Sequence, residues 1–117
     1  MSGPAARHAG IMALVALFVL QFAWHVWLDP PAPALRAATW SLALLPLAAI
    51  LAYCVRSPRR GLLAGGFVVL PYFVHGVVAT LDAGPWRALA ALEVLLAVLV
   101  VGAIGAATLI EKRARPG

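Results

Sequence analysis

Four long apolar stretches make up most of the chain. They cover about residues 9–28, 34–55, 61–81 and 86–110 and contain almost no charged side chains. A helix that rises about 1.5 Å per residue needs about 20 apolar residues to cross about 30 Å of hydrocarbon, so each stretch has the length of a membrane span. The pattern therefore predicts four transmembrane helices.

Residues that break helices separate these stretches. Proline, glycine and charged residues gather at positions 29–33, 56–60 and 82–85. Because such connections are only about five residues long, consecutive helices must run antiparallel. We expect an all-α fold, an integral membrane four-helix bundle made of two antiparallel transmembrane hairpins, as a single domain over residues 1–117.

The composition fits a lipid environment. The chain is 64% hydrophobic and 11% charged, against about 45–50% and about 25% in an ordinary soluble domain. In a soluble protein, a net charge of +5 would suggest nucleic acid binding. Here, however, the basic residues lie between or beyond the apolar stretches. We expect the lipid bilayer as the surroundings, with no nucleic acid, cofactor or metal bound. A single cysteine, Cys54, excludes an internal disulfide.

The basic residues predict the orientation. Seven lie on one side of the expected spans, namely Arg7, Arg56, Arg59, Arg60, Lys112, Arg113 and Arg115, and only Arg36 and Arg87 lie on the other. The positive-inside rule places both termini and the Arg56–Arg60 loop in the cytoplasm. The four tryptophans then lie near the outer ends of the spans, where indoles favour the headgroup region: Trp24, Trp27, Trp40 and Trp86.

The first stretch also has features of a cleavable signal peptide. Arg7 precedes the apolar run, and residues 32–34 have the small-x-small form of a cleavage site. The run is longer than a signal peptide needs, however, and aromatic and charged residues precede the candidate site. A retained membrane span is the preferred interpretation.

Five polar residues lie inside three of the expected spans. Counting from the outer ends at about 1.5 Å per residue places Gln21, His75 and Glu93 roughly 10 Å below the outer surface, with His25 shallower and Tyr72 deeper. A charged side chain within the bilayer costs about 2.5–3.5 kcal/mol on insertion scales, so such residues face the bundle interior and find partners there. We predict an intramembrane polar cluster of these five residues.

Three interpretations of this cluster are open. In a structural role, Glu93 bonded to His75, Gln21 or Tyr72 holds three helices in register. In a functional role, a buried carboxyl group and an imidazole exchange a proton near neutral pH, as in a proton-coupled transporter or ligand-binding protein. In the third, His25 and His75 are axial ligands of a haem.

Other features bear on packing and activity. Pro46 and Pro71 lie well inside their spans and predict kinks. Gly61 and Gly65 form a small-x-x-x-small pattern that favours close helix contact in lipid. The chain has no His-Glu-x-x-His sequence, no phosphate-binding glycine loop and no Gly-x-Ser-x-Gly sequence, so we expect no enzymatic activity.

Several segments resemble a known family over about residues 9–113. They are Gln21 to Pro30 (QFAWHVWLDP), Leu44 to Leu47 (LLPL), Pro71 to Val77 (PYFVHGV) and Arg87 to Glu93 (RALAALE). The chain resembles a family of small four-span inner-membrane proteins of Proteobacteria that is classed as a domain of unknown function. The resemblance implies an inner-membrane location and four helices, and it assigns no reaction and no site residues.

The sequence favours a non-enzymatic accessory or assembly subunit, because almost none of the chain lies outside the expected spans. Its partner would be a second copy of the chain or another membrane protein, contacted through helices in the bilayer. The alternative is a small proton-coupled transporter or ligand-binding membrane protein that uses the buried Glu and His residues.

Overall fold

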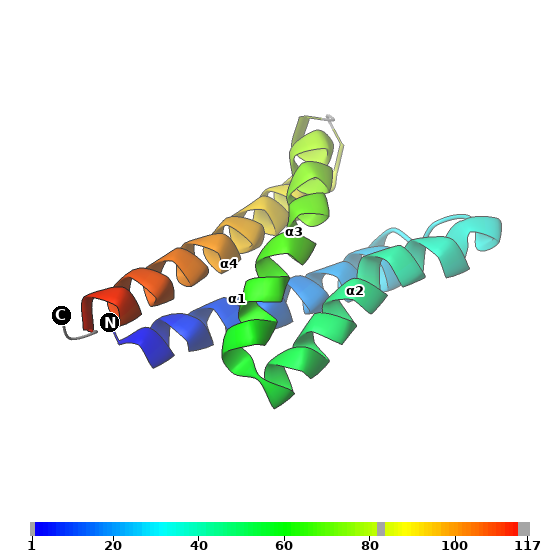
Figure 1. The fold of residues 1–117 in the computed structure, drawn as a ribbon. Helices are drawn as coiled ribbons and strands as arrows, with labels where there is room; N and C mark the ends of the chain where they lie inside the picture. Colours follow the sequence, from blue (N-terminus) through cyan, green and yellow to red (C-terminus); the bar gives the residue numbers. More distant parts are fainter. Residues whose placement is uncertain (1, 82–83, 115–117) are drawn as a thin grey trace.

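The structure, a computed structural model, describes residues 2–81 and 84–114. Over these residues it contains four long α-helices and no strand: α1 (Gly3–Phe22), α2 (Arg36–Arg56), α3 (Pro58–Leu81) and α4 (Arg87–Ala114) (Figure 1). A π-helical segment, η1 (Ala23–Leu28), continues α1, and a 3-10 turn, η2 (Pro33–Leu35), leads into α2. The four helical segments have 26, 24, 24 and 28 residues and are apolar enough to cross a membrane. The prediction of an all-α fold with four candidate spans is confirmed.

The helices extend beyond the expected spans at the end that carries the termini. Helix α1 begins at Gly3, and α4 continues to Ala114. The expected five-residue break between the second and third spans is wrong, because only Ser57 separates α2 from α3. Pro58 begins α3 rather than ending a helix, since the first turn of a helix needs no backbone N–H from that position. Arg115 and residues 82–83 lie outside the described part of the chain.

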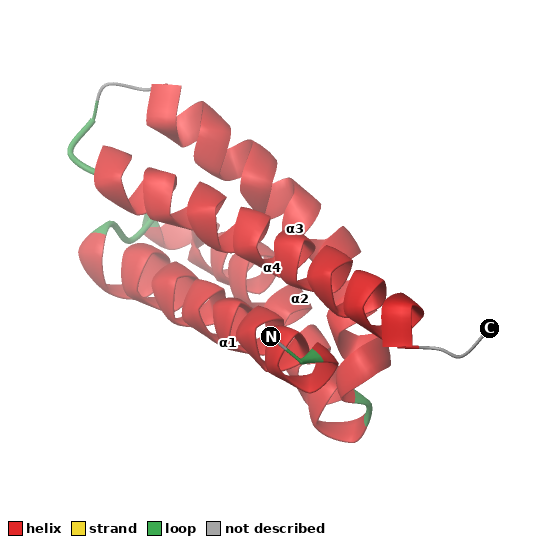
Figure 2. Ribbon diagram, turned by 90° about the vertical axis from the view of Figure 1, so that its left-hand side faces the viewer, coloured by secondary structure: helices red, strands yellow, loops and turns green. Residues whose placement is uncertain are grey.

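The helices pack as antiparallel neighbours around a shared apolar core. Helix α4 packs against both α1 and α3, and α2 packs against α3 and α1. Helices α1 and α4 run side by side (Figures 1 and 2), whereas α2 and α3 diverge from their common turn (Figure 1). The fully buried apolar side chains come from all four helices: Leu14, Leu17, Leu47, Val69 and Val100.

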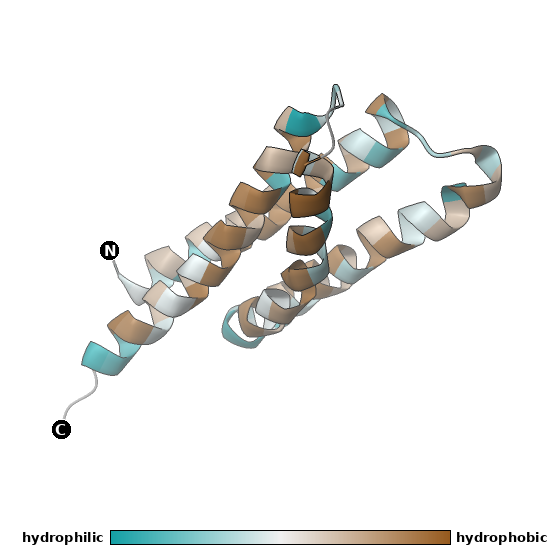
Figure 3. Cartoon of the chain, turned by 90° about the horizontal axis from the view of Figure 1, so that it is seen from above, coloured by the Kyte–Doolittle hydropathy of each residue, from teal (hydrophilic) through white to brown (hydrophobic). Residues whose placement is uncertain are grey.

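The outward faces of the helices are apolar as well, and the hydrophilic residues gather toward the helix ends (Figure 3). Val55 and Phe67, for example, are 85% and 78% exposed. In water such surfaces destabilise a fold, whereas in a bilayer they meet lipid chains at no cost. The exposure pattern is thus that of a membrane protein.

Two glycines of α3 permit the close approach of α2 and α1. A Cβ on Gly61 would lie 2.6 Å from the backbone nitrogen of Cys54, and one on Gly65 would lie 3.0 Å from Leu14 Cδ1. Only glycine therefore fits the tight turn between α2 and α3. The prediction of helix contact at this Gly-x-x-x-Gly pattern is confirmed.

An ion-pair cluster joins three helices at the end that carries the termini. The carboxylate of Glu111 on α4 pairs with Arg7 on α1, and its second oxygen lies 3.5 Å from Arg59 Nη2 on α3. This pairing was not predicted, because the sequence does not show which arginine meets the one acidic residue beyond the last span. The cluster places the start of α1, the start of α3 and the end of α4 at one end of the molecule.

Candidate functional site: a cleft with a polar floor

A buried carboxylate joins three helices at the opposite end of the bundle. Glu93 on α4 is 0% exposed and Gln21 on α1 is 1% exposed. The side-chain amide of Gln21 donates a hydrogen bond to Oε2 of Glu93, and Nδ1 of His75 on α3 lies 2.7 Å from Oε1. Both carboxylate oxygens are therefore engaged, each by a different helix. The structure brings together three of the five residues of the predicted cluster.

A glycine opposite Glu93 makes this arrangement fit. A Cβ on Gly76 would lie 2.8 Å from Val94 Cγ2 and 3.1 Å from both Ala90 O and Glu93 Oε1. Helices α3 and α4 thus approach closely beside the carboxylate. Gly76 follows His75 directly, so the close contact of α3 with α4 at Gly76 also determines the distance between His75 and Glu93.

His25 and His75 lie together with Trp24 in a group of three rings. Trp24 stacks on His25 with ring centroids 5.3 Å apart, Trp24 and His75 are 5.4 Å apart, and the two imidazoles are 5.8 Å apart. Trp24 is 4% exposed, whereas Trp27 is 77% exposed. Trp24 therefore differs from a headgroup-facing indole, since it points into the bundle and packs on the histidines.

The π-helical segment η1 carries two of these rings, those of Trp24 and His25. The Asp29 N–H donates to Trp24 O at 2.8 Å, a bond that spans five residues and widens the helix. The indole N–H of Trp40 on α2 donates to His25 O at 2.9 Å. Helix α2 is thus held against η1 at the level of the histidines. The sequence contains no proline or glycine that marks this π-helix, so it was not predicted.

The same three rings argue against a haem between the histidines. The indole of Trp24 packs on both imidazoles and fills the space in which a porphyrin held between them would lie. Among the residues that the structure describes, no group of three His, Cys, Asp or Glu side chains is placed to hold a metal ion. His25 and His75 do not fit the haem interpretation.

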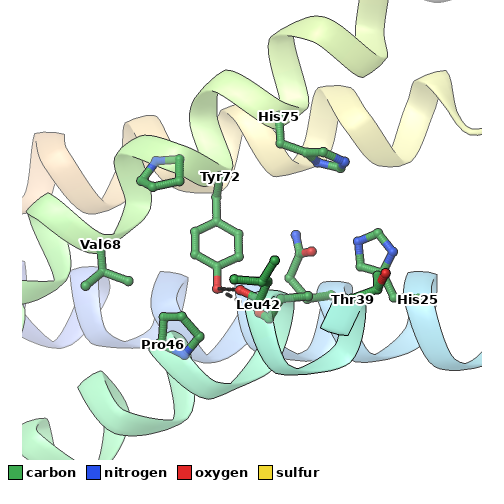
Figure 4. Close-up of a pocket in the computed structure, with 10 residues that line it drawn as sticks. His25, Thr39, Leu42, Pro46, Val68, Tyr72 and His75 are labelled. Atoms are coloured by element: carbon green, nitrogen blue, oxygen red, sulfur yellow. Dashed lines mark hydrogen bonds between the residues drawn. The ribbon is translucent and has the colours of Figure 1, made fainter. Parts of the chain in front are cut away.

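Tyr72 bonds to the backbone of α2 rather than to Glu93. Its hydroxyl donates to Ala43 O at 2.7 Å and lies 3.3 Å from Leu42 O (Figure 4). Pro46 has no N–H, so the carbonyl of Leu42, four residues earlier, lacks its usual helical donor. The hydroxyl of Tyr72 lies beside this gap in the hydrogen-bond ladder of α2. A proline in one span and a tyrosine in the next were the available signal for this contact.

A cleft of about 530 Å³ lies between α2 and α3 where the two helices diverge (Figure 4). Its walls are mostly apolar and include Leu42, Pro46, Val68 and Pro71. Polar side chains lie together within it, and they are Gln21, His25, Thr39, Tyr72 and His75. Four of these belong to the predicted cluster, and Thr39 was missed because a lone threonine in an apolar span gives no signal. Glu93 lies behind Gln21 and His75 and orients them.

The comparisons with known proteins identify a family. Residues 9–110 match the family described as predicted membrane protein (DUF2069). The curated proteins and the solved structures give no match.

Proposed function

The chain belongs to the DUF2069 family of predicted membrane proteins, and we propose that it is a non-enzymatic binding protein that takes up a lipid-soluble molecule in the cleft between α2 and α3. The observation that carries this proposal is the placement of polar side chains inside an otherwise apolar cleft. A mostly apolar concave site with a few convergent polar groups is the usual form of a small-molecule site. The volume of about 530 Å³ lies within the range of about 300–1,000 Å³ that such sites have.

We place the protein in a bacterial inner membrane with both termini in the cytoplasm. The basic residues near the termini and at the α2–α3 turn support this orientation through the positive-inside rule. Gln21 and His75 then lie roughly 10 Å below the outer surface, six or so residues from the helix ends, with His25 shallower and Tyr72 deeper. A ligand reaches them laterally from the lipid.

The contacts of Glu93 favour binding over catalysis. Gln21 and His75 already engage its two oxygens, and the carboxylate is fully buried behind them. Its role is to fix the positions of the two side chains that face the cleft.

The second candidate is an accessory or assembly subunit that binds another membrane protein. The observation that favours it is the shortness of the connections, with one residue between α2 and α3. Such a chain presents little besides its helices to a partner. In this case a helix of the partner, rather than a small molecule, occupies the cleft.

Filling the cleft tests the proposal. Val68 faces the cleft from α3, whereas its neighbour Phe67 is exposed on the outer side of the same helix. The protein is purified in mild detergent from native membranes, and bound molecules are extracted and identified by mass spectrometry. We expect the wild type and Phe67→Trp to retain the same molecule and Val68→Trp to lose it.

A second variant distinguishes loss of the molecule by filling of the cleft from loss by misfolding. Thr39→Trp fills the cleft from α2 and should also lose the molecule. Equal amounts of extracted molecule in folded Val68→Trp, Thr39→Trp and wild-type protein would contradict the proposal. A stoichiometric protein that co-purifies with the wild type and not with either cleft variant would favour the accessory role instead.

A further inference from the structure

We infer that the molecule bound in the cleft has a neutral, flat ring head that carries carbonyl or hydroxyl groups, the chemistry of a membrane quinone or quinol. This inference rests on the proposed function and names the class of ligand. It depends on three features of the cleft: its charge, the hydrogen-bonding atoms within it, and the rings that line it.

The cleft offers no unpaired counter-charge to an ionised head, because His75 is paired with Glu93. Of the residues that the structure describes, none that lines the cleft is Lys, Arg, Asp or Glu. The arginine cluster around Glu111 lies at the opposite end of the bundle. An unpaired charge within the bilayer is costly, so a phosphate or carboxylate head is disfavoured. A neutral head meets no such cost.

The polar side chains offer both donors and acceptors. Nδ1 of His75 is engaged by Glu93, so Nε2 is the atom left for a ligand. The amide nitrogen of Gln21 donates one of its two hydrogens to Glu93, which leaves the second hydrogen as a donor and the side-chain oxygen as an acceptor. The hydroxyl hydrogen of Tyr72 is donated to Ala43, and its oxygen can still accept. Neutral carbonyl and hydroxyl groups match this mixture, whereas a hydrocarbon chain leaves these atoms unsatisfied.

Several side-chain rings line the cleft around these atoms. The rings of Pro46, Pro71 and Tyr72 line the cleft beside the imidazoles of His25 and His75. The aromatic ring of Tyr72 and the two imidazoles can pack on a planar head in offset or edge-to-face geometry, and the proline rings add apolar contact. The apolar remainder of the cleft accommodates the start of a hydrocarbon tail.

Tryptophan fluorescence tests this inference. Decylubiquinone, a quinone with a short tail, is titrated into the purified wild-type protein. Quinones quench indole emission on contact. The ring centroids of Trp24 and His75 are 5.4 Å apart, so a quinone bound at His75 lies close to the indole. We expect saturable quenching in the wild type, most of which disappears in Trp24→Phe.

Two histidine variants locate the site. His75→Ala removes a hydrogen bond to the ligand and should raise the concentration for half-maximal quenching about tenfold. His8→Ala is the matched control, because His8 lies exposed near the start of α1 and bonds only to Pro4 O. Its titration should match the wild type.

Competition distinguishes the ligand classes. Dioctanoylglycerol is neutral without a ring, and dioctanoyl phosphatidate is charged, so neither should displace the quinone. Displacement by either compound, or equal quenching in wild type and His75→Ala, would overturn the inference. If decylubiquinone fails to saturate while the extraction experiment still finds a molecule that Val68→Trp loses, the inference fails and the proposed function stands.

Discussion

Replacing Glu93 by leucine tests how the bundle is held together at its polar level. The substitution removes the acceptor for Gln21 and the partner of His75 while keeping a side chain of similar size. Gln21, which is buried, then has no partner for its amide. Two contacts between helices are lost, one to α1 and one to α3.

The expected cost follows from these two contacts. Hydrogen bonds between membrane helices contribute on average about 0.6 kcal/mol and at most about 1.7 kcal/mol, so two of them account for roughly 1–3 kcal/mol. Leaving a buried amide unsatisfied adds to this cost. We therefore expect Glu93→Leu to lower the free energy of unfolding by about 2 kcal/mol. Glu93→Gln keeps an acceptor for Gln21 and should lose less than about 1 kcal/mol.

Unfolding in mixed micelles measures these values. The protein is titrated with sodium dodecyl sulfate and followed by tryptophan fluorescence, with Gln21→Leu and the double variant completing a thermodynamic cycle. We expect the double variant to be more stable than the sum of the single changes predicts, because neither partner is left alone. A Glu93→Leu protein at least as stable as the wild type would refute this structural role.

Three further predictions concern other contacts and use the same unfolding assay. Gly76→Ala should lower the free energy of unfolding by about 1–3 kcal/mol, because its Cβ would meet Val94 Cγ2 and Ala90 O. Gly105→Ala, which has open space around its Cβ, should leave the stability unchanged. Equal stabilities of the two variants would contradict this account of the α3–α4 contact. Tyr72→Phe should cost about 1 kcal/mol because the hydroxyl no longer bonds to Ala43 O, and an unchanged stability would mean that this bond does not support α2. Arg7→Glu should destabilise by about 1 kcal/mol or less through its contact with Glu111, and Arg7→Glu combined with Glu111→Arg should recover most of the loss; no recovery would show that the pair does not form.

The sequence predicted the level of the polar residues well. Helices have a fixed rise, so counting from the helix ends was enough to place Gln21, His75 and Glu93 at the same depth. The structure shows the three in contact.

The sequence did not predict which polar atoms meet. Partners depend on how each helix is rotated, and apolar periodicity constrains rotation only weakly when lipid covers the outer faces. Tyr72 was expected near Glu93. Its hydroxyl instead bonds to the carbonyl of Ala43 in the α2 backbone, three residues before Pro46. The buried position of Trp24 has the same origin, because η1 changes the rotation of the chain after α1.

The size and lining of the cleft were not predicted, although Pro46 and Pro71, which line it, were expected to kink their helices. The cleft exists because α2 and α3 share a one-residue turn and diverge from it, so that the two helices separate toward the far end (Figure 1). Divergence of two helices depends on packing among all four, and it has no local sequence signal. Once the helices are placed, Thr39 joins the candidate site without having been singled out.

The most direct test of the proposed function is to identify what occupies the cleft in living cells. A photo-crosslinking amino acid replaces Thr39, which faces the cleft, and in a control protein it replaces Phe67, which faces outward. After irradiation, the mass of each protein is measured. The account predicts that position 39 gains the mass of one discrete neutral small molecule, while position 67 gains only bulk phospholipid. A crosslink from position 39 to another polypeptide, or the same phospholipid at both positions, would contradict it.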